Sequence, residues 1–376
     1  MAIKETRQEK GGAAIQAEAK EKAVLVAVKA SANRSDSFEA SLKELESLAE
    51  TAGALVVGTL IQVRQRPSAA TFLGKGKLEE LKHLIEEKEA DLVIFDQELT
   101  PVQLRNIEKE LETKVIDRTM LILDIFAQRA RSREGILQVE LARLEYSLPR
   151  LTGKGKEMGR ITGGIGTRGG AGEQKLELDR RRIRRRIRDL KEQMNDVKKN
   201  REMQRKQRTR SGIPVISLVG YTNAGKSSLF NALCQRASRS GQAQVEADDR
   251  LFQTLDTTTR RIHLEEVGDA LITDTVGFIR NLPHHLVRAF RSTLEEAVGA
   301  DILLNVVDLS DPDYLEKLEV VDELLLELGA DRERMVTVFN KVDKCPGLQG
   351  SEGVYVSARQ GQGLPELLQL ITDRLQ

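Results

Sequence analysis

The chain has 376 residues, a formal net charge of +1, and a hydrophobic fraction of 40%. This length predicts two or three domains, and the apolar content is sufficient for their cores. A mean hydropathy of −0.37 and the absence of a long apolar run exclude a membrane span, while two Cys and four His exclude a disulfide framework and a Cys/His metal site. We therefore expect a soluble cytoplasmic protein, with residues 1–21 forming a disordered polar lead.

From residue 22 to 133, apolar strand-like runs alternate with patterns of helical spacing. The strand-like runs cover residues 23–28, 54–63, 91–95 and 114–116, and the helical patterns cover 38–48, 78–85 and 102–111. Such alternation predicts a small parallel α/β domain. It contains the turn Gly74-Lys75-Gly76-Lys77, which could bind an anion, although such a turn before a helix is more often a solvated connection.

Two apolar seams predict a long helical hairpin in the next domain, residues 134–211. Leu137, Leu141, Leu144 and Leu148 recur at spacings of four, three and four, which is the pattern of a helix packed along a narrow seam. A second set continues the same seven-residue frame: Leu176, Ile183, Ile187, Leu190, Met194 and Val197. We expect residues 134–148 to pack antiparallel against residues 174–205.

The segment that joins and follows these seams is strongly basic. Residues 151–172 hold nine glycines with Lys154, Lys156, Arg160 and Arg168, and arginine is dense at 180, 181, 182, 184, 185, 186 and 188. Residues 151–210 carry 20 Lys or Arg and eight Asp or Glu, a local net charge of +12, so the remainder carries −11. A solubilising charged helix is one interpretation, and RNA contact is the one that the arginine density favours.

The aromatic content narrows how such an RNA would be bound. Only 3% of the residues are aromatic and none is Trp, so stacking on unpaired bases is not expected to dominate. Phosphate contact and shape recognition of structured RNA fit better, and no DNA partner is expected.

The last domain, residues 212–376, opens with a phosphate-binding loop in its usual setting. A buried strand at 215–219 runs into a Gly-x-x-x-x-Gly-Lys-Ser loop and then a helix that starts near Lys226. Two glycines allow the backbone N–H groups to approach a triphosphate, Lys226 can reach the β- and γ-phosphates, and Ser227 can ligate Mg²⁺. The expected nucleotide-binding residues here are Gly220, Tyr221, Thr222, Asn223, Ala224, Gly225, Lys226, Ser227 and Ser228.

Three further motifs follow predicted strands in order. Asp274 at the end of a strand can hold Mg²⁺, and the Gly277 N–H can sense the γ-phosphate. The Asp343 carboxylate can accept two hydrogen bonds from guanine that adenine cannot offer, which selects GTP over ATP. The expected nucleotide-binding residues are Asp274, Thr275, Val276 and Gly277, then Asn340, Lys341, Val342 and Asp343, then Ser357, Ala358 and Arg359.

A GTP-dependent switch also needs a hydroxyl that binds Mg²⁺ and the γ-phosphate and is released after hydrolysis. Residues 237–261 lack strong periodicity and contain Phe252-Gln-Thr-Leu-Asp-Thr-Thr-Thr259. Our choice is Thr254, with Thr257, Thr258 and Thr259 as competitors. The expected catalytic residues are then Lys226, Thr254 and Gly277, and the expected metal ligands are Ser227, Thr254 and Asp274.

The four motifs together resemble the translation-factor-related P-loop GTPases. The run GYTNAGKSS, LFQTLD and DTVGFIRNLP, with the upstream block GGIGTRGGAGEQKLELDRRRI, resembles the HflX family from about residue 23 onward. This resemblance implies a GTPase that binds the large ribosomal subunit and its rRNA in the GTP state and splits stalled or idle ribosomes. We expect the protein to be a monomer. The block reads GAGEQKLELDR where the family more often has GPGET-x-LE-x-DR.

Two residues bear on the rate of hydrolysis. Phe278 stands where a Ras-like protein places the Gln that orients water, so we expect slow intrinsic turnover that the ribosome stimulates. In related GTPases the Asn corresponding to Asn223 can help to hold K⁺, although a turn-favouring role is equally consistent. We favour interface or packing roles for His284 and His285. We interpret Cys234 and Cys345 as ordinary small residues.

Two other functions remain open from the sequence. One is a GTP-dependent switch that acts on a protein or membrane-associated partner, with the basic helix serving only solubility. The other is an ATP-linked RNA-remodelling activity of the N-terminal domain, which is disfavoured because the chain has no second complete P-loop.

Overall fold

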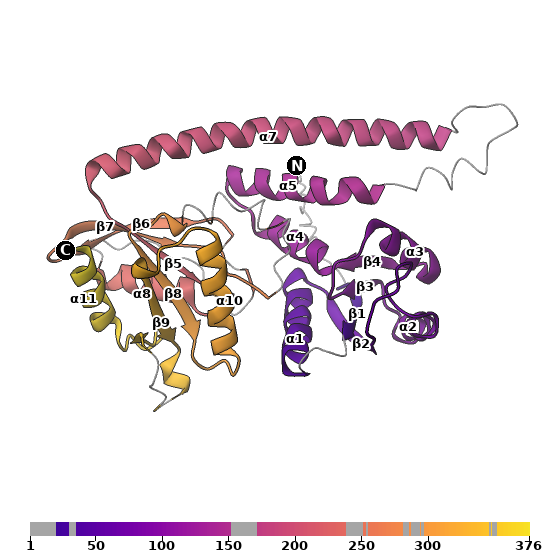
Figure 1. The fold of residues 1–376 in the computed structure, drawn as a ribbon, viewed down its shortest axis with the longest axis horizontal. Helices are drawn as coiled ribbons and strands as arrows, with labels where there is room; N and C mark the ends of the chain where they lie inside the picture. Colours follow the sequence, from indigo (N-terminus) through magenta and orange to yellow (C-terminus); the bar gives the residue numbers. More distant parts are fainter. Residues whose placement is uncertain are drawn as a thin grey trace, which may run out of the picture.

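The structure of the chain, a computed structural model, describes residues 20–29, 35–151, 171–237, 251–252, 255–280, 286, 294, 297–345, 347 and 352–376. Figure 1 shows two α/β regions side by side, with the helix α7 along the top and α5 lying alongside it, just below. Of the expected features, the lead at 1–19, most of the glycine-rich loop, Thr254, His284 and His285 lie outside the described residues.

The N-terminal region is a four-stranded parallel sheet in the order β2-β1-β3-β4, as the alternating pattern predicted. Side chains of the central strand β1 alternate between two cores, which explains its continuous apolar run. The strands are β1 (Lys22–Lys29), β2 (Leu55–Val63), β3 (Leu92–Phe95) and β4 (Lys114–Asp117). Helices α1 (Ser35–Ala52) and α4 (Arg118–Arg129) cover one face, and α2 (Lys75–Lys88) and α3 (Pro101–Leu111) cover the other.

The helical hairpin is present and is longer than predicted. Helix α5 (Arg133–Ser147) is followed by the 3-10 helix η1 (Leu148–Leu151) and, after the loop, by α7 (Ala171–Ser211). Ion pairs between described side chains hold α5 to α7, namely Glu134–Arg201 at 2.9 Å, Glu140–Arg186 at 2.7 Å and Glu145–Lys191 at 2.7 Å. Leu190 is fully buried along the predicted seam, so the heptad pattern located the contact between the helices.

Helix α5 has a second buried face that the seam did not predict. Val139, Ala142 and Tyr146 lie in the same core cluster as α1 and α4 of the N-terminal region. The Tyr146 hydroxyl also hydrogen-bonds the buried Asp117 carboxylate at the end of β4. Helix α5 therefore packs on the N-terminal sheet and on α7 at the same time.

The C-terminal region is a six-stranded sheet in the order β10-β9-β8-β5-β7-β6, parallel except for β6. Its strands are β5 (Val215–Gly220), β6 (Thr258–Leu264), β7 (Gly268–Asp274), β8 (Ile302–Asp308), β9 (Met335–Asn340) and β10 (Val354–Tyr355). Helices α8 (Lys226–Ala237) and α11 (Leu364–Leu375) pack on one face and α10 (Tyr314–Glu327) packs on the other. Strand β6 was not predicted, because its first four residues, Thr-Thr-Arg-Arg, show no apolar alternation.

Two consequences of this fold matter for function. The carboxyl ends of the parallel strands β5, β7, β8 and β9 meet at one edge of the sheet, which is where open α/β sheets bind ligands. None of the helices in the described part of the chain combines the length and apolar content that a bilayer span requires.

Candidate nucleotide site

The loop after β5 has the backbone shape that a phosphate cradle requires. Gly220 and Gly225 have φ of 137° and 88°, in the region that favours glycine. A Cβ on Gly220 would overlap the Val306 carbonyl oxygen, and one on Gly225 would overlap Asn340 Nδ2. Asn223 has a φ of 61°, which agrees with its turn-favouring interpretation.

Lys226 is buried at the start of α8. Its Nζ donates hydrogen bonds to the carbonyl oxygens of Gly220 at 3.1 Å and Tyr221 at 2.8 Å. Burial lowers the pKa of Lys226 to about 8, against the opposing effect of the Asp274 charge. A bound phosphate would supply the negative charge that keeps this ammonium protonated.

The two described metal-ligand candidates lie next to each other. Ser227 Oγ donates to Asp274 Oδ2 at 2.7 Å, and Asp274 is fully buried. Thr275 Oγ1 donates to the Leu218 carbonyl oxygen at 2.6 Å and so fixes the end of β7 against β5. A hydroxyl and a carboxylate are oxygen donors that suit Mg²⁺ with water and phosphate as further ligands. The described residues contain no cluster of three His, Cys, Asp or Glu side chains that would form another metal site.

The segment after Asp274 lies directly on the phosphate loop. The Phe278 N–H donates to the Gly220 carbonyl oxygen at 3.1 Å, and the Thr222 N–H donates to the Phe278 carbonyl oxygen at 2.7 Å. Gly277 is so close that a Cβ there would lie 2.8 Å from both Lys226 Nζ and Thr222 Cα. The Phe278 ring is buried in an apolar cluster with Tyr221, so it cannot orient a water molecule.

The last residue of β9 and the residue after it also hydrogen-bond the phosphate loop. Asn340 Nδ2 donates to the Ala224 carbonyl oxygen at 3.0 Å, and Asn340 Oδ1 accepts from the Ala358 N–H at 3.0 Å. Lys341 Nζ donates to the Asn223 carbonyl oxygen at 2.8 Å and pairs with Asp308 at 2.7 Å.

The remaining predicted base contacts also converge at this edge. Ser357 Oγ donates to Asp343 Oδ1 at 2.6 Å and so orients the carboxylate that was expected to read guanine. Val342 hydrogen-bonds the Val356 carbonyl oxygen through its N–H, while Arg359 is exposed. The Ala358 N–H, which was expected to contact the base, donates here to Asn340.

Of the competing switch threonines, two occupy defined positions in β6. Thr258 is paired with Asp274 in the antiparallel ladder between β6 and β7. Thr259 Oγ1 lies 3.0 Å from Thr273 Oγ1, so its hydroxyl is engaged within the sheet. The choice of Thr254 stays a prediction.

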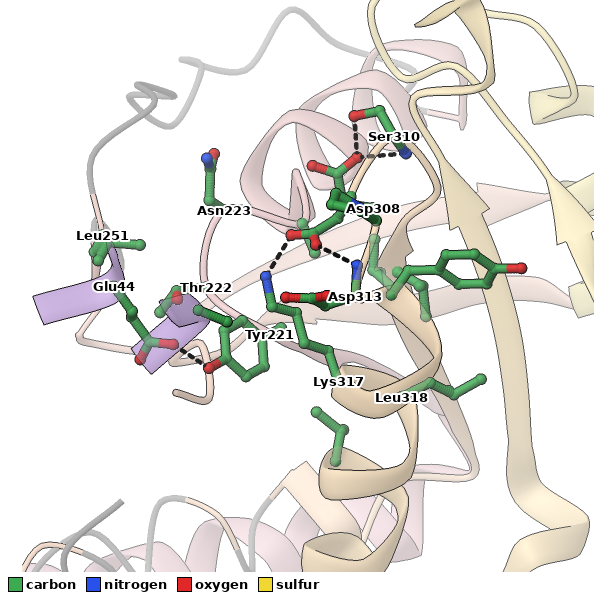
Figure 2. Close-up of a pocket in the computed structure, with 18 of the residues that line it drawn as sticks. Glu44, Tyr221, Thr222, Asn223, Leu251, Asp308, Ser310, Asp313, Lys317 and Leu318 are labelled. Atoms are coloured by element: carbon green, nitrogen blue, oxygen red, sulfur yellow. Dashed lines mark hydrogen bonds and ion pairs between the residues drawn. The ribbon is translucent and has the colours of Figure 1, made fainter. Parts of the chain in front are cut away.

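A buried polar network from the N-terminal region completes this side of the site, and the motifs gave no sign of it. Glu44 on α1 accepts a hydrogen bond from the Tyr221 hydroxyl (Figure 2). Glu44 also pairs with Arg118 at 2.7 Å. Arg118 also pairs with Asp96 at 2.7 Å and donates to the Arg280 carbonyl oxygen at 3.2 Å. The contacts join residues up to 236 positions apart, because the Arg280 N–H also donates to Glu44, so no local pattern could have revealed them.

Burial raises the pKa of Glu44 even though Arg118 and the Tyr221 hydroxyl act in the opposite direction. Beside this network lies a cavity of about 340 Å³ between α1, the outer side of the phosphate loop and the start of α10. The phosphate loop is therefore in contact with the N-terminal region at Tyr221.

Comparison with known proteins agrees with this geometry. Three family models match: the N-terminal region of GTP-binding GTPases at residues 39–127, their middle region at 129–208, and the 50S ribosome-binding GTPases at 215–341. GTPase HflX of Caldanaerobacter subterraneus subsp. tengcongensis is 49% identical and covers 95% of this chain and 81% of its own length. The chain belongs to the HflX family of GTPases.

Other members and a solved structure agree with this membership. GTPase HflX of Escherichia coli K12 is 44% identical over 89% of this chain and 79% of its own length. The crystal structure of SsGBP in complex with GDP is 28% identical, with a TM-score of 0.51 and coverage of 94% of this chain and 98% of that one. As an HflX family member, the chain is an enzyme that binds and hydrolyses GTP, so the expected family, fold class and activity are confirmed.

Proposed function

We propose that this GTPase binds the large ribosomal subunit in its GTP state and splits or recycles stalled or idle ribosomes in the cytoplasm. The subunit stimulates hydrolysis. The observation that carries the proposal is α7, a helix of 41 residues with 16 Lys or Arg and seven Asp or Glu. A helix of this length is a rod of roughly 60 Å, and its positive charge fits an rRNA surface.

Helix α7 is joined to the strand before the phosphate loop by a short connection. Helix α7 ends at Ser211 and β5 begins at Val215, so the basic helix leads almost directly into the phosphate loop. Arg186, Lys191 and Arg201 pair with α5, whereas Arg185 and Arg188 are exposed on α7. The family model at residues 215–341, described as a 50S ribosome-binding GTPase, supports the same partner. We also propose that the chain has three domains, at residues 22–133, 134–211 and 212–376.

For hydrolysis, we assign Lys226 and the N–H groups of the phosphate loop to the β- and γ-phosphates, because charge develops there as the bond breaks. Ser227 and Asp274 would hold Mg²⁺ with Thr254, and Mg²⁺ would neutralise phosphate charge. Gly277 would contact the γ-phosphate through its N–H. Since the Phe278 ring is buried, this chain has no side chain at that position to orient water, and intrinsic turnover is slow.

A second expected ion is K⁺ beside Asn223, where it would place positive charge near the β–γ bridge. The Asn223 side chain is exposed on the loop, and its own carbonyl oxygen is held by Lys341. Equal GTPase rates in K⁺ and Na⁺ would contradict this assignment.

Sedimentation with large subunits tests the proposal. We expect the protein to comigrate with them when loaded with a non-hydrolysable GTP analogue and not when loaded with GDP. Arg185→Glu with Arg188→Glu should reduce comigration by about tenfold or more, since each phosphate contact contributes to a steep salt dependence. Lys75→Glu with Lys82→Glu on α2 makes the same change of charge on exposed residues and serves as the control.

Three results would contradict the proposal. Absence of comigration in both nucleotide states would favour the alternative, a switch that acts on a protein or membrane-associated partner. Loss of comigration only in the α2 variant would move the RNA contact to the Gly74–Lys77 turn. A full GTPase rate without ribosomes would remove the stimulated mechanism.

A further inference from the structure

The N-terminus of α5 is capped by a carboxylate from the GTPase region. Asp256 Oδ2 accepts hydrogen bonds from the N–H groups of Arg131 at 2.8 Å and Ser132 at 2.6 Å, and Asp256 Oδ1 accepts from the Ser132 hydroxyl. Ser132 is itself the N-cap and accepts from the Gly135 N–H at 2.9 Å. A negative charge is favourable at this end of a helix, where backbone N–H groups have no partner within the helix.

Gly135 makes room for this contact. A Cβ at Gly135 would overlap Asp256 Oδ1. The residue lies in the first turn of α5 and does not have the positive φ that would require glycine. Glycine is unfavourable inside a helix, so the space taken by Asp256 is the physical reason for glycine at this position.

Apolar neighbours of Asp256 are docked in the N-terminal region as well. Leu251, Phe252 and Leu255 are buried in the core cluster formed by α1, α4 and α5. The Phe252 ring meets the Phe126 ring edge to face, with centroids 4.7 Å apart. Phe252 has a φ of 52°, which is unusual for a bulky residue, so this docking holds a strained backbone in place.

The docked segment is linked to the nucleotide site by two short paths. Thr258, two residues after Asp256, is paired with Asp274, whose carboxylate accepts from Ser227. Val276 and Ile279, which flank Gly277, lie in the same core cluster as Phe252 and Leu255. A Cβ built on Gly277 would lie 2.8 Å from Lys226 Nζ, so little free space separates Gly277 from this ammonium, and we expect a γ-phosphate that binds Lys226 to move Gly277.

We propose that the contact of the Asp256 carboxylate with the N-terminus of α5, for which Gly135 leaves room, couples the nucleotide state to the α5–α7 hairpin. We call this contact the joint. The Asp256 carboxylate caps α5 when GDP is bound and leaves it when GTP and Mg²⁺ displace Gly277 and its apolar neighbours. Asp256 is a positioning residue, since it acts on the hairpin and not on the phosphates. The joint rests on the proposed function only in giving the hairpin an RNA partner.

Amide hydrogen exchange measures the joint directly. In the wild-type protein we expect the Arg131 and Ser132 amides to exchange about tenfold faster or more with a GTP analogue and Mg²⁺ than with GDP, a size typical of coupling between sites. Equal protection in the two nucleotide forms would overturn the proposal.

Gly135→Ala tests the role of Asp256 without changing charge. We expect it to give fast exchange at Arg131 and Ser132 with either nucleotide, while GDP affinity stays within about twofold, because the base side of the site is untouched. Gly76→Ala is the matched control, because Gly76 lies in the first turn of α2 and a Cβ there meets nothing within 4 Å. Retained nucleotide-dependent protection in Gly135→Ala would show that Asp256 is not the joint.

The outcome can be separated from that of the proposed function. If the wild-type protein fails to sediment with large subunits, the ribosome proposal fails. The difference in amide exchange between the GDP and GTP forms is measured without ribosomes and tests the joint independently. Asp256→Asn gives a second variant that preserves the size of the side chain. It removes the negative charge at the helix end, so we expect it to lower the protection seen with GDP.

Discussion

The two sides of the nucleotide site draw on different parts of the chain. On the base side, Asn340, Lys341 and Ser357 hydrogen-bond residues of the same GTPase region, namely Ala224, Asn223 and Asp343. On the phosphate side, Tyr221 and Arg280 bond Glu44 and Arg118, which belong to the N-terminal sheet region. Among the described residues, these base-side contacts thus stay within the GTPase region, whereas the phosphate-side contacts extend to the N-terminal region.

This difference separates binding from switching. A pocket whose contacts are all local can bind GDP and GTP with the same geometry whatever the N-terminal region does. A phosphate loop that contacts the N-terminal region can be coupled to the position of that region. Nucleotide binding and that position then affect each other by the same free energy. We therefore expect mutations on the base side to change affinity and those on the shared side to change stability and coupling.

The largest effect is expected for Asn340→Ala. The change removes the hydrogen bonds to the Ala224 carbonyl oxygen and the Ala358 N–H, both held by a buried side chain. The two buried groups that lose their partners cost about 1–3 kcal/mol each, about 4 kcal/mol together, so nucleotide affinity should fall about 1000-fold. Titration with fluorescent GDP and a GTP analogue measures it.

The ratio of the two affinities is the informative quantity for this variant. We expect it to stay unchanged, since the base side does not distinguish the nucleotides. Asn106→Ala, which removes a hydrogen bond to the Ala70 carbonyl oxygen in the N-terminal region, is the control and should leave both affinities unchanged. A selective loss of GTP affinity in Asn340→Ala would show that the base side also takes part in switching.

A smaller effect, of another kind, is expected for Glu44→Gln. The side chains of Glu44 and Arg118 are 9% and 3% exposed, so removing the charge leaves a buried guanidinium with Asp96 as its remaining ion-pair partner. Breaking such a pair costs about 3 kcal/mol of unfolding free energy, while GDP affinity should hardly change. Urea unfolding followed by circular dichroism measures the loss.

The matched control is Glu46→Gln, two residues along the same helix, where the side chain is exposed. It should change stability by less than about 0.5 kcal/mol. The comparison between the two sides breaks down if Glu44→Gln weakens GDP binding as strongly as Asn340→Ala does.

The base side and the phosphate side also differ in how far the sequence could predict them. The phosphate loop, Asp274 and Asn340 follow buried strands within a few residues, so strand patterns and motif spacing brought them to one edge of the sheet. The heptad seam likewise located Leu190 between α5 and α7. Local patterns suffice where the chemistry and the strand that positions it are neighbours in sequence.

The shared side could not be predicted in this way. Glu44 lies in an amphipathic helix whose charged residues look alike in sequence, and its partner Tyr221 is 177 residues away. The second apolar face of α5 was hidden for a related reason, since Val139, Ala142 and Tyr146 do not share the heptad positions of the seam. Strand β6 was missed because its exposed positions carry Thr and Arg.

The last test uses pH to probe the phosphate side through Lys226. With a pKa of about 8, this side chain loses its proton above pH 8 in the nucleotide-free protein, and bound phosphate would restore it. Binding of GDP or GTP should then take up a proton, and affinity should fall by up to about tenfold per pH unit above pH 8. Calorimetry in buffers of different ionisation enthalpy gives the number of protons.

The unfolding free energy of the nucleotide-free protein should change in the opposite direction. Because the pKa of Lys226 in the folded protein lies below its ordinary value of 10.5, the unfolded chain holds more protons between about pH 8 and 10.5. The contribution of Lys226 to stability therefore becomes more favourable as pH rises through this window, while nucleotide affinity falls. Lys226→Arg stays charged and should lose both trends, so a pH dependence of affinity that persists in this variant would assign the proton to another group.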